Sequence, residues 1–318
     1  MAKSKDASFP RLGITTLALA AVLAGAGCAE LPRPPAGVDE RSGCSFRDDV
    51  DRHPLGEFPD GPPVPPWDTF YVDEGGSGTV LEAVPGLDKE GVRGPRVWGA
   101  NPSPPVAGRS NARLAKGDVA GLGTDQFYAF ALLVPREFRP PSSYYMPFEF
   151  GQSGIYAGGP NFDVEIDHTG ALTAHGRAGV ATGEDSEGNP TFSKYPSGLP
   201  DGPPAVIATE LERDVWHELI IRIRHHYLES EGIVQIWHRE EGDEDFEAVH
   251  NPEAGPGWPV VKTGPDGEPY VDEETEEVAQ GMTWGPYTSG AGSGEETYYD
   301  AFAVCPTLAD AKAWLGEP

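Results

Sequence analysis

Apolar and polar residues alternate with a period of two along much of the chain, which predicts β-strands. Residues 125–134 (DQFYAFALLV) form an apolar run that is typical of a buried strand. Residues 144–150 and 162–167 each place their apolar side chains on one face. A turn at 169–170 then leads into 171–175, so we expect a hairpin there.

The second half of the chain continues this pattern. Residues 215–226 (VWHELIIRIRHH) predict a long strand, and 232–238 predict its neighbour, with Trp237 facing outward. Residues 297–304 predict a closing strand, and Thr307 is expected to cap a short helix over 307–315.

Two regions carry a weaker pattern. Residues 46–98 are rich in loop-forming residues, with one strand expected at 79–84. Residues 240–278 are acidic, with scattered Gly and Pro, and are expected to be mostly loop.

Composition agrees with many short strands joined by turns. The chain of 318 residues contains 41 Gly and 33 Pro, too many for an all-α fold. About ten strands with one apolar face each predict an all-β fold, an antiparallel β-sandwich of jelly-roll type with a short C-terminal helix. We expect it to form a single domain over 43–318. The net charge of -28 argues against nucleic acid as a partner, because phosphate recognition needs a cationic surface.

The N-terminus has the features of an export signal. Basic residues precede the apolar run 12–26, which is too short to span a bilayer as a helix, so the segment 1–27 is expected to be removed. The small residues before Cys28 resemble a bacterial lipobox, which implies a lipid anchor on Cys28 followed by a Pro-rich tether over 28–42. The expected location is extracytoplasmic, either lipid-anchored to the bacterial cell membrane or secreted.

The cysteines allow one intramolecular pair. The chain has 3 Cys, so Cys44 and Cys305 remain if Cys28 carries lipid. In an exported protein, two remaining cysteines favour a disulfide, which would join the first strand to the last. Two unpaired buried thiols are the alternative.

Several segments resemble the heparin lyase I-like polysaccharide lyases, which have a concanavalin A-like jelly-roll sandwich. The segments that carry this resemblance are GRSNARL (108–114), DQFYAFALLVPREF (125–138), YYMPFEFGQ (144–152), WHELIIRIRHHYLESEGIVQIWH (216–238) and MTWGPYTSG (282–290) with TYYDAFAV (297–304). The resemblance implies β-elimination on a uronate-bearing polysaccharide and requires no cofactor.

That chemistry needs a group that neutralises the sugar carboxylate, a base for the C5 proton and an acid for the leaving oxygen. Arg109 and Arg113 are the candidate neutralising residues and share a face if they lie on one strand. Tyr287 is a candidate acid or base, and either His168 or His175 is a candidate base.

Four further residues are expected to contact the substrate: Glu149, Gln152, Trp237 and Trp284. Glu149 stands where the resembled family has an amide, and a carboxylate at that point would repel a uronate. The aromatic residues also fit an alternative function, a surface lipoprotein that binds glycans without catalysis.

A second enzyme class competes with the lyase. Asp163, Glu165 and Asp167 share one strand face, an arrangement similar to that of laminarinase-type glycoside hydrolases. A retaining hydrolase needs its two carboxyl groups about 5 to 5.5 Å apart. Residues four apart on a strand are separated by about 13 Å, and short Asp side chains hardly span that gap.

A structural Ca²⁺ is also expected near the ends of the domain. Asp48 or Asp49 lies by the first strand and Asp300 by the last, so these carboxylates become neighbours if the terminal strands pair. Calcium is bound by several hard oxygen ligands of this kind.

Overall fold

Strands dominate a computed structural model of the chain, which describes residues 43–58, 64–73, 76–102, 109–155, 158–199, 202–251, 257–289 and 296–316. All of them belong to one compact unit, Asp39–Pro318. The predicted signal segment, the tether and Cys28 lie outside the described residues. No helix among the described residues has the length and apolar character needed to cross a membrane.

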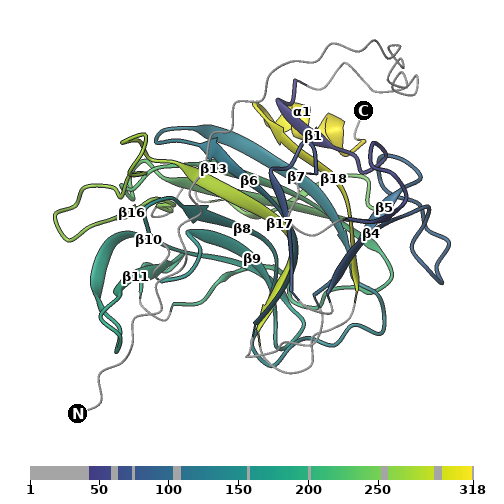
Figure 1. Ribbon diagram of the computed structural model, residues 1–318, viewed down its shortest axis with the longest axis horizontal. Coiled ribbons are helices and arrows are strands. Elements are labelled where there is room, and N and C mark those ends of the chain that lie inside the picture. Colours follow the sequence, from purple (N-terminus) through teal and green to yellow (C-terminus); the bar gives the residue numbers. More distant parts are fainter. Residues whose placement is uncertain are drawn as a thin grey trace, which may run out of the picture. The chain divides into compact units, whose positions relative to one another are not determined.

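The strands form two sheets that pack face to face (Figure 1). Sheet A has the order β15 (Glu247–His250), β14 (Ile233–Glu240), β13 (Trp216–Arg224), β7 (Asp125–Leu133), β18 (Thr297–Cys305), β5 (Val97–Asn101), β4 (Ser77–Leu81) and β2 (Gly56–Glu57), and β1 (Phe46–Asp48) pairs with β18. Sheet B has the order β11 (Pro190–Tyr195), β10 (Leu172–Glu184), β9 (Phe162–Asp167), β8 (Tyr144–Gln152), β17 (Gln280–Ser289), β6 (Arg109–Ala120) and β3 (Thr69–Val72), and β12 (Ala205–Ala208) and β16 (Lys262–Thr263) pair with β10. The predicted antiparallel jelly-roll sandwich is therefore confirmed.

The core lies between the sheets because each strand turns its apolar residues to the same side. Phe148 and Phe150 of β8 meet Tyr128 and Phe130 of β7 across the interface, with ring centroids 4.7 Å apart for Tyr128 and Phe150. A tryptophan cluster fills the space nearby. Trp67 and Trp284 stack with ring centroids 5.7 Å apart, and Trp98 packs at a tilt against Trp284 with centroids 5.2 Å apart.

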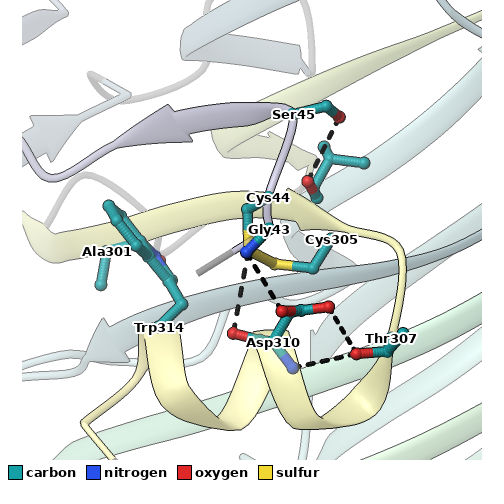
Figure 2. Close-up of a disulfide and its surroundings, with 9 residues drawn as sticks. Gly43, Cys44, Ser45, Ala301, Cys305, Thr307, Asp310 and Trp314 are labelled. Atoms are coloured by element: carbon teal, nitrogen blue, oxygen red, sulfur yellow. Dashed lines mark hydrogen bonds between the residues drawn. A yellow bond between two sulfur atoms is a disulfide. The ribbon is translucent and has the colours of Figure 1, made fainter. Parts of the chain in front are cut away.

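The ends of the domain are tied together as the sequence predicts (Figure 2). Cys44 and Cys305 form a disulfide beside the pairing of β1 with β18. The helix α1 (Leu308–Trp314) follows, and its N-cap Thr307 accepts a hydrogen bond from the Asp310 backbone N–H at 3.1 Å. Asp310 Oδ1 also accepts from the Gly43 N–H at 3.1 Å.

The regions with weak patterning contain more structure than expected. Residues 46–98 include β1 to β4 and the start of β5, and the strand expected at 79–84 is β4, which ends at Leu81. Within the acidic region 240–278, residues Trp258 to Thr263 are buried against sheet B. These short strands escape a periodicity search because each offers only a few alternating positions.

Candidate functional site

Polar side chains form a band across the outer face of sheet B, on the side away from the core. The backbone register brings them together, since Thr283 pairs with Glu149, Glu149 pairs with Asp163, and Asp163 pairs with His175. Neighbouring strands lie about 4.8 Å apart, so side chains on one face of such a row are in contact. We call this set the polar row: Arg113, Thr283, Tyr287, Glu149, Asp163, Glu165, His175 and Arg177.

At one end of the polar row the Arg113 guanidinium is fixed by three neighbours. It forms an ion pair with Glu149 and lies 3.4 Å from Thr283 Oγ1. Its Cζ also lies 4.7 Å from the centroid of the Tyr287 ring, within the range of a cation–π interaction. The Arg113 and Glu149 side chains are only 19% and 15% exposed, so water screens this pair less than a surface salt bridge. Arg113 is therefore held in place beside Tyr287.

At the other end, His175 lies between two carboxylates. Its Nε2 is 2.7 Å from Glu165 Oε2 and 3.1 Å from Asp163 Oδ1. Burial lowers the pKa of His175, but Asp163 and then Glu165 outweigh it and raise the pKa to about 9. His175 is therefore an imidazolium at neutral pH when only protons bind there. Arg177 lies beyond it, with Nη1 3.8 Å from Asp163 Oδ2.

Lys262 is a neighbour of this band that was not among the predicted site residues. It lies on β16, parallel to β10, and its buried ammonium donates to the Gly159 carbonyl and lies 5.2 Å from the centroid of the Phe192 ring. Burial and then Arg177 lower the pKa of Lys262 to about 7, against the opposing effect of Glu149. The apolar run WPVV directly before Lys262 is the signal that a segment of this acidic region returns to the sheet.

The charge of the band differs from that of the whole chain. Positive groups on Arg113, His175, Arg177 and, in part, Lys262 face the carboxylates of Glu149, Asp163 and Glu165. In a chain with net charge -28, a region whose charges balance is less negative than the average surface of the chain. Tyr71 of β3 lies next to Arg113 in register and is 50% exposed, which adds an aromatic surface at the edge of the sheet.

Four of the residues predicted for the lyase site lie in the polar row: Arg113, Glu149, Tyr287 and His175. Arg109 is the first residue of β6, where its backbone pairs with Ser289, and its side chain lies outside the described part of the structure. His168 is exposed in the turn between β9 and β10, and His175 occupies the position next to the carboxylates instead.

The other predicted contacts with substrate must be corrected. Gln152 is buried, because it shares the inward face of β8 with Phe148 and Phe150. Its Oε1 accepts from Asn161 and from the Lys262 N–H at 2.7 and 2.8 Å. Trp284 is fully buried in the core tryptophan cluster. Trp237 is half-buried on sheet A, where it packs near Phe127 and far from the polar row.

The acidic strand β9 does place its three carboxylates on one outer face, but they do not form a free pair. Asp163 is fully buried, and Glu165 contacts His175. Asp167 Oδ1 accepts hydrogen bonds from the Thr169 N–H at 2.7 Å and from the Ala171 N–H at 3.1 Å, which fixes the turn. The arrangement expected for a laminarinase-type hydrolase is therefore absent from these three residues.

The terminal carboxylates lie near one another, and of the two predicted alternatives Asp49, not Asp48, is the neighbour of Asp300 that is available for an ion. Asp48 is used in the core, where it accepts from Trp67 Nε1 at 2.7 Å and contacts His53 Nε2 at 2.9 Å. Asp49 takes its place near Asp300. Each has a buried Oδ1 without a hydrogen-bond partner, and burial raises the pKa of both carboxyls, as does the nearby Asp51. Such oxygens fit a hard cation.

No family model and no curated protein matches the chain. Among solved structures, the backbone is similar to an endo-β-1,4-glucuronan lyase from the fungus Trichoderma reesei, with 15% identity, a TM-score of 0.48, and coverage of 84% of this chain and 98% of that one. It is also similar to the alginate lyase vAL-1 from Chlorella virus, with 14% identity, a TM-score of 0.38, and coverage of 75% and 92%. A third similar structure is the catalytic domain of a GH131 β-glucanase from Podospora anserina, with 13% identity, a TM-score of 0.38, and coverage of 72% and 79%. The likeness thus extends to lyases and a glucanase and does not single out heparin lyase I.

Proposed function

We propose that the chain is an exported polysaccharide lyase that cleaves a uronate-bearing glycan by β-elimination at the polar row. The observation that carries the proposal is the charge balance of this band in a chain of net charge -28. A strongly acidic face would repel a uronate, whereas fixed cations can neutralise its carboxylate. The Glu149 carboxylate, which would otherwise repel the substrate, is paired with Arg113.

The residues divide the reaction as follows. Arg113 binds the uronate carboxylate and so favours loss of the C5 proton, because negative charge spreads onto that carboxylate in the transition state. Tyr287, held beside the Arg113 cation, acts in its deprotonated form: it takes the C5 proton and gives that same proton to the leaving oxygen as the C4–O bond breaks and the C4–C5 double bond forms, so it ends deprotonated again. Arg177 and the imidazolium of His175 add positive charge along the sugar chain.

The test is the ultraviolet absorbance of the unsaturated product when the chain meets glucuronan, alginate or a heparin-type glycan. We expect turnover of one of these, and a loss of about 10²- to 10³-fold in kcat for Arg113→Ala, the size found when one transition-state donor is removed. His168→Gln, in the exposed turn, is the matched control and should keep full activity.

A non-catalytic glycan-binding protein is the competing function. Tyr71 favours it, because an exposed aromatic ring can stack on a sugar without any chemistry. Retention on a glycan column together with no unsaturated product across the panel would replace the lyase proposal with this one.

We further propose that Asp49 and Asp300 hold a structural Ca²⁺ next to β1 and β18. The support is their pair of buried carboxylate oxygens without hydrogen bonds. Saturating calcium should raise the free energy of unfolding by about 3 kcal/mol at 100 times the dissociation constant. Asp300→Asn should abolish this gain, and Asp68→Asn, at an exposed salt bridge with Lys116, should leave it unchanged. Equal gains in all three proteins would contradict the assignment.

We also propose that a lipid on Cys28 anchors the domain outside the cytoplasm. The Cys44–Cys305 disulfide supports an oxidising location. Labelled fatty acid should be incorporated into the chain in a bacterial host and lost in Cys28→Ala. Incorporation that survives this substitution would overturn the proposal.

A further inference from the structure

The Asp163 carboxylate is buried without the hydrogen bonds that such a group normally has. Its side chain is 0% exposed, and neither carboxylate oxygen has a hydrogen-bond partner. The nearest positive groups are His175 Nε2, 3.1 Å from Oδ1, and Arg177 Nη1, 3.8 Å from Oδ2. Burying an ionised carboxylate is costly unless it is paired with a positive charge, hydrogen-bonded or bound to a metal. Asp163 is thus paired with positive charge, but both of its oxygens keep the capacity to bind a further positive ligand.

Two neighbouring groups complete a set of ligand atoms around Asp163 Oδ1. His175 Nε2 lies 2.7 Å from Glu165 Oε2, and the ligand atoms of Asp163, Glu165 and His175 all lie within 4.8 Å of one another. Adjacent ligands of a six-coordinate ion with bonds of about 2.1 Å are separated by about 3 Å. The two distances from His175 Nε2 lie on either side of this value.

The sheet holds these three residues in place. Asp163 and His175 are direct partners across β9 and β10, and Glu165 is the next residue on the same face of β9. Because β9 and β10 are both hydrogen-bonded to neighbours on each side, their backbones provide a rigid frame for the ligands. The site thus needs only small side-chain shifts to receive an ion.

We propose that Asp163, Glu165 and His175 form a binding site for a divalent first-row transition metal, such as Zn²⁺ or Mn²⁺. One imidazole and two carboxylates suit this class, whereas Ca²⁺ and Mg²⁺ are held by oxygen ligands. The ion takes the place between the carboxylates that the His175 proton otherwise fills. Water molecules complete its coordination on the solvent side, where Glu165 and His175 are 15% and 13% exposed.

A second cluster of similar composition does not need an ion. His217 Nδ1 lies 3.0 Å from His238 Nε2, and His217 Nε2 lies 2.8 Å from the Glu212 carbonyl. His217 therefore donates through Nε2 and accepts from His238 through Nδ1, so these ring nitrogens are satisfied by one another and by the backbone. Glu240 Oε1 lies 3.6 Å from His217 Nδ1, so this cluster also combines histidine with a carboxylate. Because its ring nitrogens are already hydrogen-bonded, we use it as the internal control.

The consequence for catalysis rests on the proposed function. A metal at this position lies beside Glu149 in the polar row and supplies a second positive centre for a uronate carboxylate. Metal binding is measured without any glycan, so a negative result for the metal site leaves the lyase function untested, and a negative result for the lyase function leaves the metal site untested.

The test is metal binding by the purified full chain after treatment with a chelator, with excess Ca²⁺ present to fill sites made of oxygen ligands. Mn²⁺ is followed by electron paramagnetic resonance, and Zn²⁺ by its displacement of bound Mn²⁺. We expect one saturable site per chain. Glu165→Gln and His175→Gln should each weaken it by at least about 100-fold, the upper range for loss of a group that only supports a ligand.

Two controls make the outcome specific. Asp167→Asn changes the next carboxylate on the same face of β9, and His238→Gln removes a histidine of the second cluster. Both should bind Mn²⁺ within about threefold of the original chain, since additivity holds for groups that share no partners. The proposal is overturned if the natively folded chain shows no saturable site, or if binding is lost in His238→Gln and kept in Glu165→Gln. Asp163→Asn, checked by circular dichroism, should also lose the site.

Discussion

At the scale of single residues, the ion pair between Arg113 and Glu149 decides what the polar row attracts. The two side chains are largely buried, so the charge of each is neutralised mainly by the other and less by water. A substrate carboxylate that approaches Arg113 must compete with Glu149 for the same guanidinium. The pair therefore acts as a built-in limit on affinity for acidic glycans.

Glu149→Gln should consequently strengthen binding of a uronate oligosaccharide by about threefold to tenfold. Like charges about 6 Å apart repel by roughly 1 kcal/mol or more at the effective dielectric constants of a half-buried site. Isothermal titration calorimetry measures the change, and a neutral oligosaccharide is the control whose affinity should not move. Weaker binding of the acidic ligand would mean that Glu149 orients Arg113 more than it competes for it.

His225 gives the fold a defined response to acid. It is fully buried, with Nε2 3.0 Å from the Tyr128 hydroxyl, and burial lowers the pKa of its imidazole to about 4. The unfolded chain binds this proton at pH about 6.5, so between pH 6.5 and 4 it holds more protons than the folded chain. The contribution of neutral His225 to the free energy of unfolding is thus fully present above pH 6.5 and is lost as the pH drops from 6.5 to 4.

His225→Gln should reduce the slope of unfolding free energy against pH by about 1.4 kcal/mol per pH unit in that window. Urea unfolding at a series of pH values measures this slope. His168→Gln, which changes an exposed histidine, should leave the slope as it is. A slope that stays unchanged in His225→Gln would show that His225 is protonated in the folded chain.

The site residues were predictable where side chains point alternately to the two faces of a strand without interruption. Glu149 follows from β8, but Gln152 has the opposite parity and so turns inward, as strand geometry requires. Tyr287 and Trp284 are separated by an irregularity in the pairing of β17 with β8, which a single sequence does not reveal. The hairpin was predicted, but its register was not, and only the register places His175 opposite Asp163 and so favours it over His168.

At the scale of elements, the disulfide secures the short edge strand β1. This strand has only 3 residues, and its pairing with β18 is reinforced by the contact of Gly43 with Asp310 of α1. A cross-link between residues separated by 261 positions removes much of the freedom of the unfolded chain. The bond therefore contributes mainly by raising the free energy of the unfolded state.

Replacing both Cys44 and Cys305 by Ala should lower the free energy of unfolding by about 3 to 5 kcal/mol. Guanidinium chloride titrations of the two proteins measure the difference, and circular dichroism checks that the strands still form. The original chain under reducing conditions should match the double variant. A loss below about 1 kcal/mol would show that pairing of β1 with β18 persists in the unfolded chain.

Long strands were predictable and short ones were not, for a physical reason. β7, β13 and β18 each bury most of their residues, which leaves a long apolar or alternating stretch in the sequence. β2 and β16 have 2 residues each, and their position depends on the strands that they join. Lys262 belongs to β16, so the same limit kept it out of the predicted site.

At the scale of the whole molecule, the net charge of -28 opposes the approach of an acidic polymer, although the polar row attracts it at contact. The repulsion acts over long range and is screened by salt, with a Debye length of about 30 Å at 0.01 M and about 8 Å at 0.15 M. The attraction acts between groups in contact and is screened less.

We therefore expect kcat/KM for a uronate polymer to rise severalfold between low and physiological salt. This direction is opposite to that of proteins whose whole surface attracts a polyanion. Initial rates at constant pH and increasing NaCl measure it, with a neutral polymer or a short uncharged oligosaccharide as control. A steady fall in kcat/KM over the same range would mean that the polar row dominates the field at long range.

The buried tryptophans determine which optical signal can be used to study this protein. Of its 7 tryptophans, Trp67, Trp98, Trp258, Trp284 and Trp314 are fully enclosed. Their emission should be blue-shifted and insensitive to aqueous quenchers, and it should change sharply when the chain unfolds. A glycan that settles on the outer face of sheet B touches none of them, so intrinsic fluorescence reports the integrity of the fold while ligand titrations require a different probe.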